Sequence, residues 1–245
     1  MLDDESRLDA LLRDFAAVAG KKMLVHGGGR QATTMAQAMG MESRMIDGRR
    51  VTDAEMLRVV TMVYGGLVNK TMVARLQALG VNALGLTGAD VDLLRSHRRP
   101  VVEGVDYGFV GDIDQVNHRT LRRLLDADIV PVVAPITHDG QGQLLNTNAD
   151  TIATELAIAL SEHYAVHLLF AFEKSGVLAN PADEESVITE LRVADFPTLE
   201  ASSAISGGML PKLRNAVRAV RQGVREVSIG KSIFMTESEG TRILR

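Results

Sequence analysis

Short apolar segments alternate with amphipathic segments along most of this chain, and this alternation restricts the fold more than any other feature. The apolar segments have strand length and lie at 23–26, 81–86, 129–136, 165–172 and 226–230. Strands that are apolar on both faces and are separated by helices are typical of a mostly parallel sheet covered on both sides. We therefore predict an α/β fold, a three-layer αβα sandwich with a mostly parallel central sheet.

Helical periodicity fills the segments between these strands. The predicted helices span 4–18, 30–40, 51–80, 118–128, 148–164 and 207–224. Thr52 is followed three residues later by Glu55, the capping-box pattern of a helix start. Gly65 and Gly66 interrupt the longest helix, as a kink or as a close helix contact, and 98–114 has the composition of a hairpin. A polar, glycine-rich stretch near 136–146 predicts a change of lobe, with lobes 1–140 and 141–245.

Composition excludes several classes of protein. The net charge of −4 and the 4% aromatic content argue against a nucleic-acid-binding surface, although a local site for one phosphate ligand fits. The chain has no cysteine, which excludes disulfides and thiolate chemistry. No window approaches 18 uninterrupted apolar residues, and the acidic, amphipathic start is unlike a secretory signal. We expect a cytoplasmic protein without a membrane span.

Three consecutive glycines stand where the first strand should give way to a helix, in HGGGR at 26–30. Glycine lets the backbone approach a ligand closely, and amides at a helix start bind anions. Gly27, Gly28 and Gly29 therefore suit a phosphate or an oxyanion, although a tight turn explains them equally well. The pattern is neither the P-loop motif nor the dinucleotide-binding fingerprint.

Three further clusters fit the same kind of ligand, each with a simpler alternative. Gly207 and Gly208 precede a helix with Lys212 in its first turns, where a lysine is sensible if an anion binds and is otherwise a solvated surface residue. In LLNTNADT, the alternating residues Asn146, Asn148 and Asp150 would face one side of an extended segment, or would simply cap the following helix.

The last cluster is DGRRVTD, in which Arg50 precedes the long helix. Arginine forms bidentate pairs with carboxylates, so Arg50 suits a substrate carboxylate, whereas most arginines at such positions are solvated.

Six motifs in this order and spacing resemble the acetylglutamate kinases of the amino-acid kinase family. They are HGGGR, GRRVTD, GGLVNK, LNTNAD, GGMLPK and GTRIL, and they extend from residue 26 nearly to the C-terminus. The resemblance implies transfer of phosphate from ATP, with Mg²⁺, to the γ-carboxylate of N-acetyl-L-glutamate in arginine biosynthesis. It also implies that the lobe 1–140 binds the acylated glutamate and forms a homodimer, and that the lobe 141–245 binds ATP.

The resemblance further implies a role for each matching residue on the substrate side. The amides of Gly28 and Gly29 would bind the γ-carboxylate and the phosphate in transfer. Arg50 would bind the α-carboxylate, and Asn146 and Asn148 would bind the rest of the amino-acid part.

On the nucleotide side, Lys212 would stabilise charge during transfer, and Asp150 would organise the catalytic lysines. Gly207, Gly208 and Glu173 would contact the nucleotide. The nucleophile is already a carboxylate, so no general base is needed and His26 is expected to be structural.

The resemblance is incomplete at the start of the chain. Relatives begin with a strand and a Lys-x-Gly-Gly loop that carries the first catalytic lysine, whereas no lysine occurs here before Lys21. We therefore expect a sheet without its first strand and impaired transfer, or else a start that is misassigned or truncated.

Three alternatives for the function stay open. The acyl group could be succinyl, so that N-succinyl-L-glutamate is the substrate. The acceptor could be carbamate, aspartate or glutamate. The chain could also be a substrate-binding form without turnover.

Overall fold

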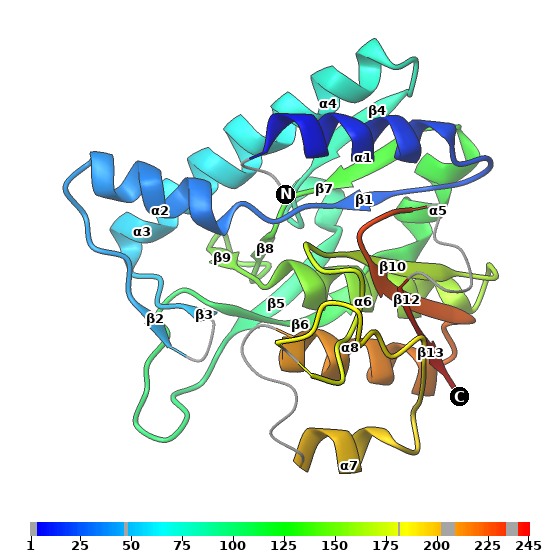
Figure 1. Ribbon diagram of the computed structural model, residues 1–245. Coiled ribbons are helices and arrows are strands. Elements are labelled where there is room, and N and C mark those ends of the chain that lie inside the picture. The colour runs from blue at the N-terminus through cyan, green and yellow to red at the C-terminus, as the bar shows by residue number, and fades with distance from the viewer. Residues whose placement is uncertain (1–3, 47–48, 181, 202–208, 234–239) are drawn as a thin grey trace. The chain divides into compact units, whose positions relative to one another are not determined.

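The computed structural model describes residues 4–46, 49–180, 182–201, 209–233 and 240–245 (Figure 1). Contacts divide the chain into two compact units, one ending at Ile152 and the other running from Ala153 to Arg245. The α/β class predicted from the sequence is confirmed. Within the described ranges, no helix is both long enough and apolar enough to cross a membrane.

The first unit holds most of the helices and strands. Its helices are α1 (Glu5–Ala17), α2 (Gly29–Ala38), α3 (Ala54–Val60), η1 (Thr61–Val68), α4 (Asn69–Ala78), η2 (Asp90–Asp92) and α5 (His118–Asp126), and α6 (Ala149–Ser161) starts here. Its strands are β1 (Leu24–Val25), β2 (Met45–Ile46), β3 (Arg49–Arg50), β4 (Ala83–Leu86), β5 (Leu94–Arg98), β6 (Gly111–Val116), β7 (Val130–Val133), β8 (Ile136–His138) and β9 (Leu144–Asn146).

Parallel pairing organises the core of this unit. The strands lie in the order β1–β7–β4, and both pairings are parallel. Helix α4 packs against β4 and β7, and α5 packs against β7. Helix α1 lies beside α4 (Figure 1), and it buries Leu8, Leu12 and Phe15, which recur at helical spacing. A second sheet has the order β6–β5–β8–β9, and β2 and β3 form a separate antiparallel pair. The hairpin expected in 98–114 corresponds to β5 and β6, which pair antiparallel.

Two sequence predictions about this unit are wrong. The apolar run 129–136 is not one strand, because β7 ends at Val133 and β8 begins at Ile136 in the other sheet, with Pro135 between them. Pro135, which cannot donate a ladder hydrogen bond, lies at the point where the chain changes sheet. Thr52 does not cap the long helix. The cap is Asp53, whose carboxylate accepts from the Met56 amide at 2.8 Å.

The second unit has one four-stranded sheet, in the order β10 (His167–Ala171), β12 (Glu226–Gly230), β13 (Thr241–Leu244) and β11 (Glu190–Arg192). The pairings β10–β12 and β11–β13 are parallel, and β12–β13 is antiparallel. Helix α8 (Met209–Arg221) packs on β12 and β13, and α7 (Phe196–Ala201) lies between β11 and α8 in the sequence. Leu213, Val217 and Ile229 are among the side chains that form its core.

The two glycines of the long helix lie in a π-helical segment. Residues 61–68 form η1, which continues from α3 and leads directly into α4. A π turn holds one residue more between its hydrogen-bonded groups than an α turn, and such turns are frequent at functional sites. The interruption predicted at Gly65 and Gly66 is therefore a wide turn, and it buries Val63, Tyr64 and Val68.

A buried histidine joins three elements of the first unit. The Nδ1 atom of His26 lies 2.7 Å from the Gly27 carbonyl oxygen, and its Nε2 atom lies 3.1 Å from the Asn69 side-chain nitrogen. A carbonyl only accepts, so Nδ1 carries the proton and Nε2 accepts from Asn69. The same Asn69 nitrogen donates to the Val132 carbonyl at 2.9 Å. His26 therefore ties the glycine loop to α4 and to β7, as expected for a structural residue.

This arrangement predicts a loss of stability in mild acid. Burial lowers the pKa of His26, although its hydrogen bond to Gly27 acts in the opposite direction. As the pH falls through about 6.5, the unfolded chain binds a proton on this side chain before the folded protein does. The free energy of unfolding should therefore fall by up to about 1.4 kcal/mol per pH unit below that value.

Urea denaturation between about pH 7 and pH 5.5 measures this slope, in a range above the titration of most carboxylates. The variant His26→Gln should be less stable at neutral pH and should show a shallower slope. An identical slope in both proteins would contradict the assignment.

Candidate functional site

A pocket of about 190 Å³ lies in the first unit, at the carboxyl end of β1. Its wall comes from the glycine loop 27–29, from Arg49 and Arg50 of β3, from Tyr64 of η1 and from the segment 146–149. Drug-sized ligands usually occupy about 300 Å³ or more, so this volume suits a ligand of amino-acid size. Gly28, Gly29, Arg50, Asn146 and Asn148 were predicted from three separate motifs, and all five line this one pocket.

The glycine loop makes the first helix N-terminus of the pocket. Gly28 caps α2 with φ of 152°, a region that side chains disfavour, and Gly29 is the first helical residue. A Cβ on Gly28 would also lie 2.8 Å from the Cδ1 atom of Tyr64. The first amides of a helix have no partner within it and carry the positive end of the dipole. The loop therefore presents an anion-binding surface, and its glycine at position 28 is required by both conformation and space.

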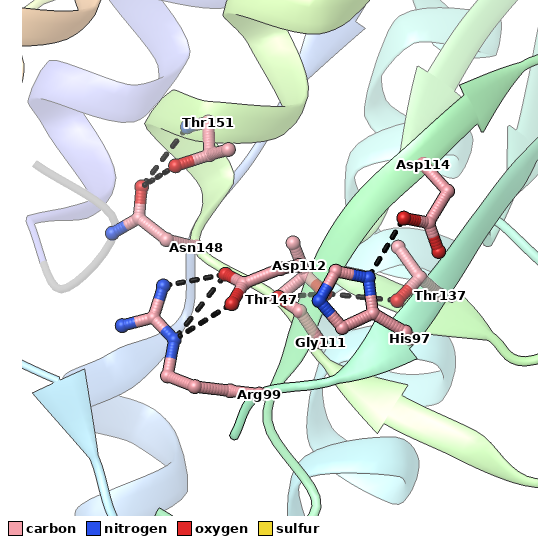
Figure 2. A network of polar contacts seen from close by, with 9 residues as sticks. All are labelled: His97, Arg99, Gly111, Asp112, Asp114, Thr137, Thr147, Asn148 and Thr151. Atoms are coloured by element: carbon pink, nitrogen blue, oxygen red, sulfur yellow. Dashed lines mark hydrogen bonds and ion pairs between the residues drawn. The ribbon is translucent and has the colours of Figure 1, made fainter. Parts of the chain in front are cut away.

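A second helix N-terminus reaches the same pocket. Asn148 precedes α6, and its side-chain oxygen accepts from the Thr151 amide at 3.0 Å (Figure 2). Asn148 is thus the helix cap, as one reading of the sequence proposed, and it also lines the pocket. Asp150 lies in the first turn of α6, within the helix predicted over 148–164. There its carboxylate is favoured by the helix dipole.

Arg50 is buried, with 7% of its surface exposed, so the alternative of a solvated arginine is wrong. Its Nη2 donates to the Gly29 carbonyl and to the Thr33 hydroxyl, each at 2.8 Å. Its Nη1 donates to the Ser43 hydroxyl at 2.6 Å. These bonds hold the guanidinium flat against the first turn of α2, beside the anion-binding amides.

Asn146 is linked to Arg50 through a buried hydroxyl. The Asn146 side-chain nitrogen donates to Thr52 Oγ1 at 2.9 Å, and that hydroxyl donates to the Arg50 carbonyl at 3.1 Å. This explains why Thr52 is not a helix cap, since its side chain is used between β9 and β3. The link therefore holds Asn146 and Arg50, two pocket-lining residues from distant motifs, in fixed positions relative to each other.

Arg49 is a lining residue that the sequence analysis missed. Burial lowers its pKa, the charge of Arg99 adds to this effect, and Asp112 and Tyr107 oppose it. The Asp112 carboxylate is engaged by Arg99, whose Nε lies 3.1 Å from Oδ2 (Figure 2). Among the described residues, the lining contains two guanidinium groups and no carboxylate, so the pocket is positively charged.

Tyr64 was also missed, and no sequence signal distinguishes it from a core residue. It lies in a long apolar helix pattern, where an aromatic residue usually belongs to the core. Only 5% of its surface is exposed, yet it lines the pocket. Helical periodicity could not place it, because the π turn of η1 interrupts that periodicity.

The second unit holds the remaining predicted residues. Lys212 lies in the first turns of α8 and is 8% exposed, so a freely solvated lysine is excluded. Its ammonium group lies 4.8 Å from the ring centre of Phe170 and 6.0 Å from that of Phe172, within cation–π range. Glu173 follows β10 and is exposed. Gly207 and Gly208 lie outside the described residues.

The geometry suits recognition of a small ligand with more than one anionic group. Two helix N-termini and two guanidinium groups line one small cavity. No cluster of three or more His, Asp or Glu side chains that could hold a metal occurs within the described ranges.

Comparison with known proteins agrees with these features. The sequence pattern of the "Amino acid kinase family" matches residues 1–231. The acetylglutamate kinase of Parabacteroides distasonis is 57% identical over 99% of this chain and 95% of its own length. That of Bacteroides thetaiotaomicron is 56% identical over 99% of this chain and 94% of its own length.

A solved structure, smu.665 from Streptococcus mutans UA159, superposes with a TM-score of 0.80 at 27% identity, covering 95% of this chain and 88% of that one. The pattern extends over nearly the whole sequence, and the identity is far above what a shared fold alone would require. The chain belongs to the amino acid kinase family.

Proposed function

We propose that this chain transfers the γ-phosphoryl group of ATP to the γ-carboxylate of N-acetyl-L-glutamate, a step of arginine biosynthesis. The observation that carries the proposal is the small, positively charged pocket at the ends of α2 and α6. Relatives more than half identical to this chain bear the name acetylglutamate kinase, which supports the choice of acceptor.

The acceptor side of the reaction uses the pocket. The amides of Gly28 and Gly29 bind the γ-carboxylate, and Arg50 binds the α-carboxylate at the other end of the substrate. Asn146 and Asn148 bind the amino-acid part between them. A γ-carboxylate oxygen attacks the γ-phosphorus of ATP, the bond to the bridging oxygen breaks, and ADP leaves. The carboxylate is already ionised at neutral pH, so no proton has to be removed.

The donor side uses groups of the second unit. Lys212, held as a buried cation over Phe170, stabilises the charge that develops on the phosphoryl group. Asp150 orients the cationic groups of the reaction. Gly207, Gly208 and Glu173 contact the nucleotide. Mg²⁺ is part of the proposal, and when bound with the nucleotide it would neutralise part of the charge of the phosphates.

Four predictions from the sequence stay predictions. They are the division of substrate and nucleotide binding between 1–140 and 141–245, the homodimer, the cytoplasmic location, and a sheet that lacks its first strand. Sedimentation velocity of the purified protein tests the predicted homodimer directly.

An assay of ADP release tests the proposed reaction. Purified protein with MgATP should release ADP with N-acetyl-L-glutamate, and should do so at least about tenfold less efficiently with L-glutamate, L-aspartate or carbamate, which lack the acyl group or one carboxylate. A preference for one of these other acids would overturn the acceptor assignment. Calorimetric binding of N-acetyl-L-glutamate without ADP release would instead support a substrate-binding form with impaired transfer.

Replacing Lys212 should reduce kcat more than it changes substrate binding. The variant Lys212→Met keeps the length of the side chain and removes its charge, and kcat should fall about 100- to 1,000-fold. The affinity for N-acetyl-L-glutamate, measured by calorimetry, should stay within about twofold.

The matched control for this variant is Arg214→Met on the same helix. Its side chain is 61% exposed and pairs with Glu200 at the surface, so its loss should leave kcat unchanged. An equal fall in kcat in both variants would show damage to α8 rather than a role in transfer.

A second candidate substrate is N-succinyl-L-glutamate, and the position of Arg49 favours it. Arg50 already serves one carboxylate in the proposal, whereas Arg49 adds a second guanidinium group to the same pocket. A succinyl group carries a third carboxylate, which a second arginine can pair with.

If succinyl is the native acyl group, Arg49→Ala should raise the KM for N-succinyl-L-glutamate about 10- to 100-fold and that for N-acetyl-L-glutamate about threefold or less. Arg44→Ala is the control, because Arg44 is exposed and lies just before β2. Equal effects on both substrates would argue against the succinyl group.

A further inference from the structure

Tyr64 lines the pocket together with the glycine loop and Arg50, the groups where anions are expected to bind. Its ring carbon Cδ1 lies 2.8 Å from the position that a Cβ on Gly28 would take, so the ring packs directly under the glycine loop. The charge of Arg50 and a hydrogen bond from its side chain both act to lower the pKa of the Tyr64 hydroxyl. One side chain therefore contacts both groups to which the proposed function gives the substrate carboxylates.

The phenol is neutral at physiological pH. Burial raises the pKa of Tyr64, and this outweighs the opposite effect of Arg50. An arginine can only donate, so the phenol oxygen is the acceptor in any bond between the two groups. The hydroxyl proton is then directed away from Arg50, and a ligand oxygen in the pocket is a suitable acceptor.

We infer that Tyr64 is a substrate-binding residue, whose ring contacts the methylene chain of the bound acylated glutamate and whose hydroxyl donates to one of its oxygens. The inference rests on the proposed function, since it takes the ligand of this pocket to be the acylated glutamate.

The π-helical segment explains how a buried side chain reaches the pocket. Tyr64 lies in the middle of η1, directly before Gly65 and Gly66. A Cβ on Gly65 would lie 3.4 Å from the Cγ2 atom of Thr87, so the helix passes close to the end of β4 at this point. The wide turn and the absence of side chains after Tyr64 let the ring fill the space below Gly28.

Calorimetric titration with N-acetyl-L-glutamate tests the inference without requiring turnover. The variant Tyr64→Phe keeps the ring and removes the hydroxyl, and its Kd should rise about 3- to 10-fold, the cost of one hydrogen bond. The Kd for a non-hydrolysable ATP analogue should not change. Tyr164→Phe, at a tyrosine of the second unit, is the control and should match the wild type.

A double-mutant cycle tests the contact between the ring and the loop. Gly28→Ala should weaken binding of N-acetyl-L-glutamate strongly, both because φ is positive and because the new Cβ meets the ring. In a Tyr64→Leu background the ring is gone, so the same change should cost at least about threefold less. Thermal unfolding of each variant identifies any that fail to fold. Tyr64→Phe removes only one oxygen and is therefore the variant expected to disturb folding least.

The outcomes separate the inference from the proposed function. If the wild type does not bind N-acetyl-L-glutamate, the proposed function fails and the inference fails with it. If the wild type binds but Tyr64→Phe binds equally well, or if Gly28→Ala costs the same factor in both backgrounds, only the role of Tyr64 is overturned. Weaker binding in Tyr64→Phe together with coupling in the cycle supports both.

Discussion

The hydrogen bonds of one neutral imidazole hold the pocket of this protein together. His26 donates to the carbonyl of Gly27 and accepts from Asn69, which in turn donates to β7. The glycine loop has no side chains with which to anchor itself, so its conformation depends on the groups around it. With one side of the loop fixed by His26 and the other packed on Tyr64, the first amides of α2 are directed into the pocket before any ligand arrives. Such preorganisation avoids the free-energy cost of ordering the loop on binding.

The charge of the pocket comes from the backbone as much as from side chains. Helix dipoles at α2 and α6 cannot be neutralised by a change of pH, and a guanidinium group stays protonated throughout the physiological range. The Asp112 carboxylate pairs with Arg99 and also acts on Arg49, but it is not among the residues that line the cavity. The cavity thus favours anionic ligands over a wide pH range, and its small volume limits them to the size of an amino acid.

Most of the helices and strands could be predicted from the sequence, because their hydrophobic patterns extend over whole segments and the ends of these segments carry glycine or proline. Five of the predicted residues, Gly28, Gly29, Arg50, Asn146 and Asn148, also line one pocket, since strand ends and helix starts of an α/β fold meet at one edge of a sheet. The failures were local. Thr52 satisfied the capping pattern, but a long-range bond to Asn146 used its side chain, and Asp53 took its place. Arg49 and Tyr64 could not be recognised, because a sequence pattern does not reveal which arginine of a pair faces a cavity or where a helix widens.

The π-helical segment has a consequence for how this pocket can change over evolutionary time. A π turn contains one residue more than an α turn, so losing a single residue in 61–68 would convert a π turn to an α turn while the helix on either side keeps its register. Asn69 and the core contacts of α4 would persist through such a deletion, while the side chain below Gly28 would be exchanged for another. The lining of the pocket could thus change while the parallel sheet and its anion-binding loop stay intact.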